Sequence, residues 1–514
     1  MRSKTLVILL LLALANAVGM GLTNLKLSHD YPSGNYVVAN EGITIYNQDN
    51  EYYLDPVDNY LAGKGWRRSP PLGNGSYYRR TPGYSILYFL ATKATGNSPT
   101  GKFYVVVGAQ VLLYLLSVLA IWCMVPMLTP SKWAQAGTTL VFAVLPYVSS
   151  YTFMTVTESL YPHFLVYYLY WVLRAYYDGK YLFPERTGAF VLAAAFLTFS
   201  ILTRPVTGIL GLILVVLYLR ALLRGPVAPG QWAWSMACVV AVPVVLVGAW
   251  TARNYVLTKD FVPLEVAYHP QSHDRMKPEF KGLFTFVKTW GEDGAAMNEW
   301  QIPLLTKTLV DGDTSIAHVD AILARFPPQT VGMFGRPRLR SVLRQYQSVT
   351  YSLKQYYDRH VPMPAQYSRL QLDTQSRFDS LTREYAQRFP LKYYVGVPLI
   401  YLKRAVFNSG TSNSYLFQEP FRSHRVLVML RLLFLVVHIA AYFCILFNAW
   451  SFRHDAARWV VFCLVPLLYL GFFVVYFQEI EQRYLLPSLM LALLGLHRPL
   501  ALLEHRFARR PALA

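Results

Sequence analysis

The sequence predicts an all-α integral membrane protein in which about ten helices cross the bilayer. Of its 514 residues, 54% are hydrophobic and 15% are charged, and the mean hydropathy is +0.28, values that exclude an ordinary soluble globular protein. Apolar runs approaching the ~20 residues needed to cross ~30 Å of hydrocarbon recur along the chain. Polar and apolar residues do not alternate within these runs, so they predict helices rather than the strands of a membrane barrel.

Ten apolar runs are candidates for membrane-spanning helices. The first, residues 5–22, holds Ala15-Asn16-Ala17 inside the run rather than after it, so we expect an uncleaved span instead of a signal peptide. Its basic N-terminus then lies in the cytoplasm. The other runs are residues 103–127, 134–150, 160–173, 188–203, 206–219, 232–250, 432–449, 459–477 and 484–496.

The distribution of basic residues supports this orientation. Lys and Arg concentrate in the short loops placed inside, whereas the short outer connections carry only Arg204 and Arg483. A cysteine introduced at Asn74 or Thr374 is therefore expected to react with an impermeant thiol reagent from outside, and one at Gly179 is not.

The same topology divides the chain into three parts. We expect an N-terminal membrane core over residues 1–250, whose first outer loop covers residues 23–102. An extracytoplasmic cap follows over residues 251–425, and the C-terminal spans with a basic cytoplasmic tail occupy residues 426–514. The expected location is the bacterial inner (plasma) membrane, with the active site facing the periplasm.

Five ionisable residues meet at the outer end of the predicted bundle. They are Asp49, Glu158, Arg204, Arg253 and Arg483. An ionisable group near hydrocarbon is costly unless it is paired or faces a wet cavity. A shared polar cavity explains the whole one-sided set, whereas the alternative is that each charge anchors its own helix at the interface.

Several stretches around these charges resemble one known family. In chain order they are Asp49 and Tyr53 with LAGKGW at 61–66 and RRTPGYSILYFL at 79–90, TESLYPHFLVYYLY at 157–170, LTRPVTG at 202–208, AWTARNYVLTKDFVPL at 249–264 and EQRYLLPSLML at 481–491. Together they resemble the GT-C glycosyltransferases that use polyprenyl-phosphate sugars, whose members include the protein O-mannosyltransferases and the aminoarabinose transferases of lipid A. The resemblance does not extend over most of residues 265–390.

The resemblance implies a fold and an activity. The fold would be a GT-C membrane bundle with interfacial helices in the first outer loop and a helical outer cap. The activity would be transfer of a monosaccharide from a polyprenyl-phosphate donor to an acceptor hydroxyl on the extracytoplasmic face, with inversion. The partners would be the lipid-linked sugar, a lipid, glycan or protein acceptor, and membrane lipids, with no nucleic acid. Two alternatives are a transferase of the O-antigen-ligase type with a lipid-diphosphate donor, and a non-enzymatic lipid-sugar flippase or transporter.

This chemistry needs a base for the acceptor proton and fixed positive charge for the leaving phosphate. The resemblance implies that Asp49 is the base, and that Glu158 is a second acidic residue holding the acceptor or the sugar. For Glu158 the alternative is an ordinary acid at a helix N-terminus. The candidates for binding the donor phosphate are Arg79, Arg80, Arg204, Arg253 and Arg483, and further candidates for the substrate site are Tyr53, Tyr84 and Glu481.

The other carboxylates of the first outer loop have simpler explanations. Asp55 precedes Pro56, a pattern typical of an N-cap followed by proline at the first helical position, while Asp58 is expected to be solvated and Glu51 peripheral. Asn50 stands where relatives often have a second acid, which removes one metal ligand from the loop. We therefore predict no metal site and no nucleotide motif, and leave open a divalent cation as cofactor.

Overall fold

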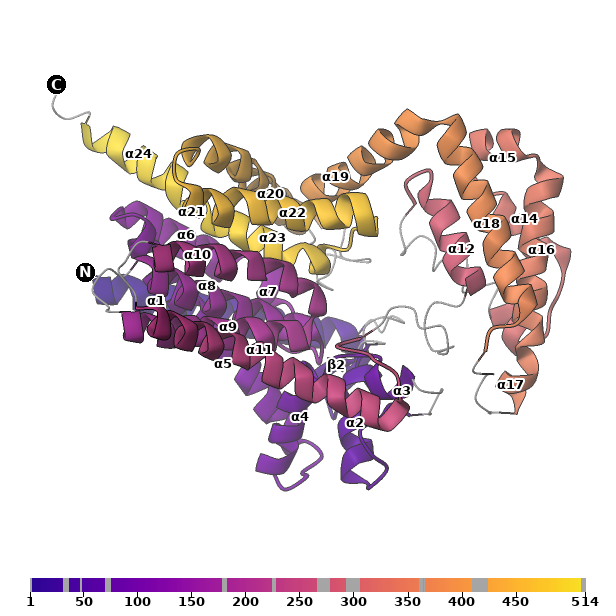
Figure 1. Cartoon of the computed structure of the whole chain (residues 1–514), viewed down its shortest axis with the longest axis horizontal. Coiled ribbons are helices and arrows are strands. Elements are labelled where there is room, and N and C mark those ends of the chain that lie inside the picture. Colours follow the sequence, from indigo (N-terminus) through magenta and orange to yellow (C-terminus); the bar gives the residue numbers. More distant parts are fainter. Residues whose placement is uncertain are drawn as a thin grey trace.

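The computed structural model describes residues 2–30, 37–46, 49–69, 75–177, 183–223, 228–265, 278–292, 306–359, 364, 366–408 and 424–509. Within these ranges helices dominate, and a bundle of long apolar helices lies beside a smaller helical cap (Figure 1). Eight helical segments of the described chain are long and apolar enough to cross a membrane. The protein is therefore a multi-pass integral membrane protein, and the predicted all-α membrane bundle is confirmed.

The eight long segments are formed by single helices or by helices joined end to end. They are α1 (Arg2–Asp30), α5 (Gly101–Leu128), α9 (Phe183–Thr203), η2 with α10 (Pro205–Leu210 and Gly211–Leu223), α11 (Pro229–Thr258), α20 (Arg425–Ser451), α21 to η9 (Ala456–Trp459, η8 Val460–Leu464, α22 Val465–Gly471 and Phe472–Phe477) and α23 with α24 (Gln482–Leu494 and His497–Arg509).

Two of the ten predicted spans form shorter helices. The run at 134–150 gives α6 (Lys132–Val144), which ends at Leu145 because Pro146 cannot donate the next backbone hydrogen bond, and a short α7 (Pro146–Ser149) follows. The run at 160–173 gives α8 (Tyr161–Tyr177), whose 17 residues fall just short of a full crossing. Its buried residues surround the helix, so α8 lies at the centre of the bundle.

Both chain termini lie at one end of the bundle, and the helices of the first outer loop lie toward the other (Figure 1). These loop helices are α2 (Glu51–Leu61), α3 (Gly75–Tyr78) and α4 (Gly83–Ala94). The predicted N-cap at Asp55 is wrong, because α2 begins four residues earlier, at Glu51, and holds Pro56 inside the helix. The Asp55 carboxylate instead accepts a hydrogen bond from the backbone N–H of Ser69 at 3.4 Å.

A short β-hairpin precedes α2, an element that the all-helical prediction did not include. β1 (Val37–Ala39) pairs antiparallel with β2 (Thr44–Tyr46). The backbone N–H of Ile45 also donates to the carbonyl of Phe153 at 3.0 Å, which ties the hairpin to the segment between α7 and α8. The hairpin thus fixes the chain three residues before Asp49.

The cap has a hydrophobic core of its own, around Phe286, Val319, Leu343 and Phe378. Its elements are α12 (Pro278–Lys288), η3 (Thr306–Val310), α14 (Ile316–Leu323), α15 (Pro328–Phe334), α16 (Arg336–Ser352), α17 (Lys354–Asp358) and α18 (Arg369–Arg388), after which η4 (Lys392–Gly396) and α19 (Val397–Phe407) lead back to α20. The ammonium of Lys288 in α12 donates to the carbonyl of Phe477 at 2.6 Å, which joins the cap to the bundle.

The structure changes the choice of labelling positions on the cap. Thr374 is buried and its hydroxyl donates to the carbonyl of Leu370 at 2.7 Å, so a cysteine there is a poor probe. Ser376 is exposed on the same helix and replaces it. Asn74 and Gly179 lie outside the described residues.

Candidate functional site

Asp49 lies between two arginines that come from distant parts of the chain. One of its carboxylate oxygens accepts a hydrogen bond from Nη2 of Arg80 at 3.1 Å, and the other accepts from Nη1 of Arg483 at 3.2 Å. Arg80 lies in the turn before α4, and Arg483 is the second residue of α23. The structure therefore brings an arginine from the N-terminal part of the chain and one from the C-terminal part to the same carboxylate.

The charge state of Asp49 follows from these contacts. Burial by itself would raise the pKa of its carboxyl, but the charges and hydrogen bonds of Arg80 and Arg483 outweigh burial and lower the pKa to about 2. Asp49 is therefore ionised at neutral pH. In this arrangement it is also a weak base, because both arginines stabilise its charged form.

A second carboxylate, Glu158, forms a buried pair beside the first. It lies in η1 (Thr157–Ser159) and is 2% exposed, and Nη1 of Arg204 donates to its Oε1. The hydroxyl of Thr157 donates to its Oε2 at 3.0 Å and accepts from Arg204 at 3.1 Å. Burial by itself would raise the pKa of Glu158, but the charges of Arg204 and Arg483 have the larger effect, so the pKa lies below its usual value.

Arg483 connects the two carboxylates. Its Nη1 lies 3.2 Å from Asp49 and 3.8 Å from Glu158, and its Nε donates to Glu481, two residues earlier. The ring of Tyr484 supports the cluster, because the guanidinium carbon of Arg204 lies 4.4 Å from its centroid and that of Arg483 lies 5.2 Å away. One continuous ionic network thus contains three acids and three arginines.

The glycine of the Pro-Gly-Tyr turn allows this network to form. A Cβ atom at Gly83 would lie 2.7 Å from the carbonyl oxygen of Leu202 and from the Cα of Thr203, closer than real Cβ contacts come. Because Gly83 has no side chain, α4 begins directly against the end of α9. Arg80 and Arg204, which flank this contact, are thereby brought to the same end of the bundle.

The two tyrosine candidates have different surroundings. Tyr53 is buried in α2, its ring lies 6.0 Å from the guanidinium carbon of Arg80, and burial raises the pKa of its hydroxyl. Tyr84 packs against Tyr53 with 5.6 Å between ring centroids, but its hydroxyl donates to Oε1 of Gln110 at 2.9 Å. Tyr53 therefore lines the network, and Tyr84 supports it from behind.

Two of the five arginine candidates have other partners. Arg253, in α11, donates to the backbone carbonyls of Trp66 and Tyr77, and so fastens the first outer loop to the bundle. Arg79 lies over the ring of Tyr52, with 4.1 Å from its guanidinium carbon to the centroid. The sequence alone could not distinguish these contacts from phosphate binding. Arg79 and Arg80, for example, are neighbours in one motif.

One acid near the network, Glu265, was not among the residues predicted from the sequence. Oε1 of Glu265 lies 3.9 Å from Nη1 of Arg80. The only signal for it was its position directly after the stretch 249–264, where the family resemblance stops. Within the described part of the chain, no group of three or more His, Cys, Asp or Glu side chains is arranged to hold a metal ion.

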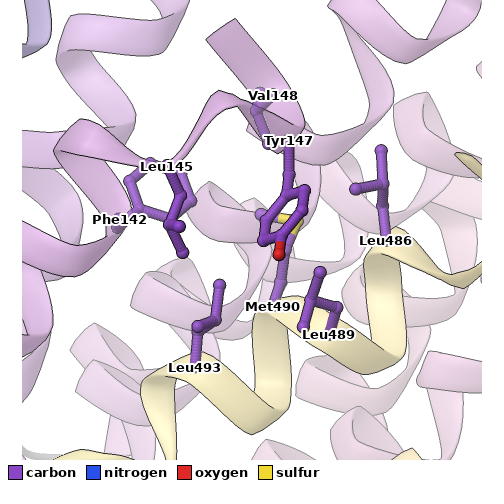
Figure 2. A pocket seen from close by; sticks show the side chains of 8 residues that line it. All are labelled: Phe142, Leu145, Tyr147, Val148, Leu486, Leu489, Met490 and Leu493. Carbon is purple, nitrogen blue, oxygen red and sulfur yellow. The ribbon is translucent and has the colours of Figure 1, made fainter. Parts of the chain in front are cut away.

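The enclosed space inside the bundle is separate from this network. Figure 2 shows a pocket between the α6–α7 connection and α23, with the ring of Tyr147 at its centre. Its volume is about 10 Å³, enough for about one water molecule. Its lining residues are Phe142, Leu145, Tyr147, Val148, Leu486, Leu489, Met490 and Leu493. The pocket is a packing space between helices rather than a substrate site.

A larger apolar groove of about 730 Å³ runs along α11 on the side of the bundle. It is lined by Pro243, Val244, Val247, Gly248, Thr251, Ala252, Tyr255 and Phe261. Arg253, on the same helix, holds the first outer loop, and the hydroxyl of Tyr78 in that loop donates to Asp260 at 3.0 Å. The groove and one attachment point of the first outer loop therefore lie on the same helix.

No protein-family model and no curated protein matches the sequence. Among solved structures, the chain is similar to the oligosaccharyltransferase of Archaeoglobus fulgidus in the apo form, with 13% identity and a TM-score of 0.48 over 100% of this chain and 52% of that one. It is also similar to ArnT from Cupriavidus metallidurans in the apo state, with 15% identity and a TM-score of 0.35 over 88% of this chain and 73% of that one. With ArnT bound to undecaprenyl phosphate, the identity is 14% and the TM-score is 0.36, over 95% of this chain and 77% of that one.

Both proteins are GT-C glycosyltransferases, so the structural similarity is to the family that the sequence resembles. The chain spans about half the length of the oligosaccharyltransferase. At these identities the likeness concerns the fold and says nothing of the sugar or the acceptor.

Proposed function

We propose that this protein is a membrane glycosyltransferase that moves a monosaccharide from a polyprenyl phosphate to an acceptor hydroxyl at the outer face of the membrane. The observation that carries the proposal is the placement of the Asp49 carboxylate between Arg80 and Arg483. It supplies a proton acceptor and two phosphate-binding groups within a few ångströms of one another. Glycosyl transfer from a lipid phosphate needs both.

The proposed reaction is a single displacement. The acceptor oxygen attacks the anomeric carbon, the bond from that carbon to the phosphate oxygen breaks, and its electron pair leaves with the polyprenyl phosphate. Asp49 takes the acceptor proton, while Arg80 and Arg483 stabilise the negative charge that develops on the phosphate. Attack opposite the leaving group inverts the anomeric centre.

The two arginines explain how a carboxylate with a pKa of about 2 can serve as a base. A donor phosphate competes with Asp49 for the same guanidinium groups. As Arg80 and Arg483 turn toward the phosphate, they stabilise the Asp49 carboxylate less, and the nearby phosphate charge destabilises it, so its pKa rises. Donor binding would thus strengthen the base only when there is a substrate to attack.

Glu158 has a positioning role in this proposal. Its oxygens are already engaged by Thr157 and Arg204, and it is almost fully buried, which leaves little room for an acceptor sugar. It holds Arg204 in place and lies 3.8 Å from Arg483. We therefore assign it to orienting the arginines, in place of the substrate contact expected from the sequence.

The donor lipid needs an apolar path to this site. We assign the groove along α11 to part of the polyprenyl chain, because its lining is almost wholly apolar and Arg253 of the same helix fixes the first outer loop. The lipid chain would then lie along the side of the bundle with its phosphate at the outer end.

The experiment is a transfer assay with purified protein in liposomes. A panel of polyprenyl-phosphate sugars and candidate acceptors is supplied, and glycosylated products are identified by mass spectrometry. We expect one donor to give a glycosidic product together with free polyprenyl phosphate, and Asp49→Asn to abolish most of it. Transbilayer movement of the labelled donor without any product would contradict the proposal and indicate a flippase, and transfer only from lipid-diphosphate donors would indicate the O-antigen-ligase type.

A further inference from the structure

A single buried amide, that of Gln110 in α5, makes four hydrogen bonds behind the ionic network. Its Oε1 accepts from the hydroxyls of Tyr84 at 2.9 Å and Ser159 at 2.8 Å. Its Nε2 donates to the backbone carbonyls of Thr152 at 2.7 Å and Met154 at 3.3 Å. Gln110 is 0% exposed, so all of its donors and acceptors are satisfied inside the protein.

The partners of Gln110 are neighbours of residues in the network. Tyr84 is the second residue of α4, directly after the turn that carries Arg80, and Ser159 directly follows Glu158. Thr152 and Met154 flank Phe153, whose carbonyl accepts from Ile45 in the hairpin before Asp49. One amide is therefore linked to the segments that carry Arg80, Glu158 and Asp49.

We propose that Gln110 is a positioning residue for the transfer reaction, setting the spacing between the Asp49–Arg80 and Glu158–Arg204 pairs without touching substrate. The inference rests on the proposed function for its kinetic part. Its physical basis is that an amide alone offers two acceptor sites at one end and two N–H donors at the other. Glutamate would place a carboxylate oxygen against two carbonyls. Leucine would remove the partner of the Tyr84 hydroxyl and of both carbonyls in the interior, while the hydroxyl of Ser159 would keep only its contact with the carbonyl of Val156 at 2.6 Å.

The simpler alternative is that Gln110 only joins neighbouring helices, as other polar residues of α5 do. α5 carries a polar stripe in which Tyr114 and Ser117 follow Gln110 by four and seven residues. The hydroxyl of Tyr114 donates to the carbonyl of Ala143 at 2.9 Å, and Ser117 is hydrogen-bonded to Nδ1 of His163 at 2.9 Å, so both join helices inside the bundle. Gln110 differs in that its four partners all lie in segments that carry the ionic network.

The chain offers a matched control. Gln135 in α6 is also a buried glutamine, and its Nε2 donates to the carbonyl of Trp122 at 2.9 Å, toward the end of the bundle that holds the termini. Gln135→Leu removes a buried amide just as Gln110→Leu does, and none of its contacts reaches the network. Both variants should lose stability, but only the Gln110 variant should lose catalytic geometry.

The kinetic test compares these variants per folded molecule. For Gln110→Leu and Gln110→Glu we expect kcat to fall about 10- to 100-fold, because misplacement by about 1 Å can cost that much. The KM for donor should change by less than about threefold, since attraction between phosphate and arginine depends weakly on orientation. Gln135→Leu should keep the kcat of the wild type. A kcat for Gln110→Leu no lower than that of Gln135→Leu would overturn the inference.

A second measurement needs no activity. Hydrogen exchange at the backbone amides of Ser159, Leu160 and Ile86, all hydrogen-bonded in this structure, reports on both segments held by Gln110. All three should exchange faster in Gln110→Leu and be unchanged in Gln135→Leu. Unchanged exchange in Gln110→Leu would overturn the positioning role, even if the protein proved not to be a glycosyltransferase. If neither the wild type nor any variant transfers a sugar, that result would instead count against the proposed function alone.

Milder changes keep the inference testable if Gln110→Leu fails to fold. Tyr84→Phe and Ser159→Ala each remove one of the two hydroxyls that donate to Gln110. Each should lower kcat, and the double variant should lower it by less than the product of the two single effects, because both act through one amide. Wild-type kcat in both single variants would contradict the inference.

Discussion

Ion pairs around Asp49 and Glu158, at one end of the bundle, differ from those on the cap in how their charges are shared. On the cap, Arg338 and Glu384 form a bidentate ion pair, with 2.8 Å between Nη1 and Oε2. Their side chains are 47% and 39% exposed. At the bundle end, Glu158 is 2% exposed, and Arg483 is shared among Asp49, Glu158 and Glu481. The cap pair is complete by itself, whereas Arg483, whose side chain is 23% exposed, serves several acids at once.

This difference separates charges that are candidates for a functional role from charges that only decorate the surface. An exposed pair such as Arg338–Glu384 contributes only ~0–1 kcal/mol and can be lost without much effect. Removing one partner of a buried pair typically costs ~3–5 kcal/mol, because it leaves an unpaired charge in the interior. A network built around the buried Glu158 is therefore costly to maintain for stability alone, and its shared, partly buried arginines are candidates to accept another anion, such as the phosphate of a donor.

The largest expected effect is that of Asp49→Asn on turnover. The change is nearly isosteric and removes the base, so turnover should fall by ~10²–10⁴-fold, the usual contribution of general-base catalysis. Asp55→Asn and Asp58→Asn, in the same helix-loop region, are the controls and should change the rate only slightly. Near wild-type transfer by folded Asp49→Asn would show that Asp49 is not the base. Loss of activity in Asp55→Asn alone would show that the first outer loop has been misinterpreted.

A smaller effect is expected when arginines are replaced by lysine. Arg483→Lys keeps the charge but loses the planar fork that serves three carboxylates, so turnover should fall about 10- to 100-fold. Arg338→Lys is the matched change on the cap and should leave turnover unaltered. Arg253→Lys should mainly lower the melting temperature, with a smaller effect on kcat, because Arg253 donates hydrogen bonds to backbone carbonyls of the first outer loop. Equal rates for Arg483→Lys and Arg338→Lys would remove the distinction between the two regions.

The junction of cap and bundle should have a still smaller effect. Lys288→Met removes the hydrogen bond to the carbonyl of Phe477, which is followed by Gln478 in a left-handed conformation (φ 53°) and then by the segment that carries Arg483. We expect a two- to tenfold loss of turnover, about the range for changes that act at a distance. Lys354→Met is the control, since Lys354 donates to the carbonyl of Val310 at 2.8 Å within the cap. Equal rates for the two variants would indicate that the cap does not act through Lys288.

The ion pairs of Asp49 with Arg80 and Arg483 should also make the free energy of unfolding depend on pH. The pKa of Asp49 is about 2 in the folded protein and 3.8 in its usual state, so its ion pairs stabilise the fold above pH 3.8. This contribution is lost as the pH falls from 3.8 through 2, when the folded carboxylate takes up its proton. Thermal unfolding of wild type and Asp49→Asn should therefore differ most above pH 4 and converge toward pH 2. A difference that stays constant over this range would contradict the low pKa.

The sequence predicted which residues gather at the outer end but not how they pair. Apolar run lengths and basic loops place Glu158, Arg204 and Arg483 at one end of the bundle, because each lies at the end of a span or in a turn, and they place Asp49 in the loop at the same end. Pairing of Asp49 with Arg483 joins positions 434 residues apart, which depends on how the helices pack.

The remaining differences have local causes. Arg79 and Arg80 are adjacent but diverge, one over Tyr52 and one onto Asp49, and no periodicity distinguishes them. Asp55 has the pattern of an N-cap, yet α2 starts at Glu51, since burial of Tyr53 and Val57 on one face favours the longer helix. Gln110 is one of the few polar residues in the apolar run 103–127, and the role that we propose for it depends on its four partners.

The most direct test of the shared arginines is the affinity of Asp49→Asn for polyprenyl phosphate without a sugar, measured in detergent or nanodiscs beside the wild type. Asparagine carries no charge, so it neither competes for Arg80 and Arg483 nor repels the phosphate. The account predicts that Asp49→Asn binds polyprenyl phosphate at least as tightly as the wild type while its turnover is reduced. Affinity and turnover that fall together would contradict it, because Asp49 would then organise the phosphate site rather than compete with the phosphate for the same two arginines.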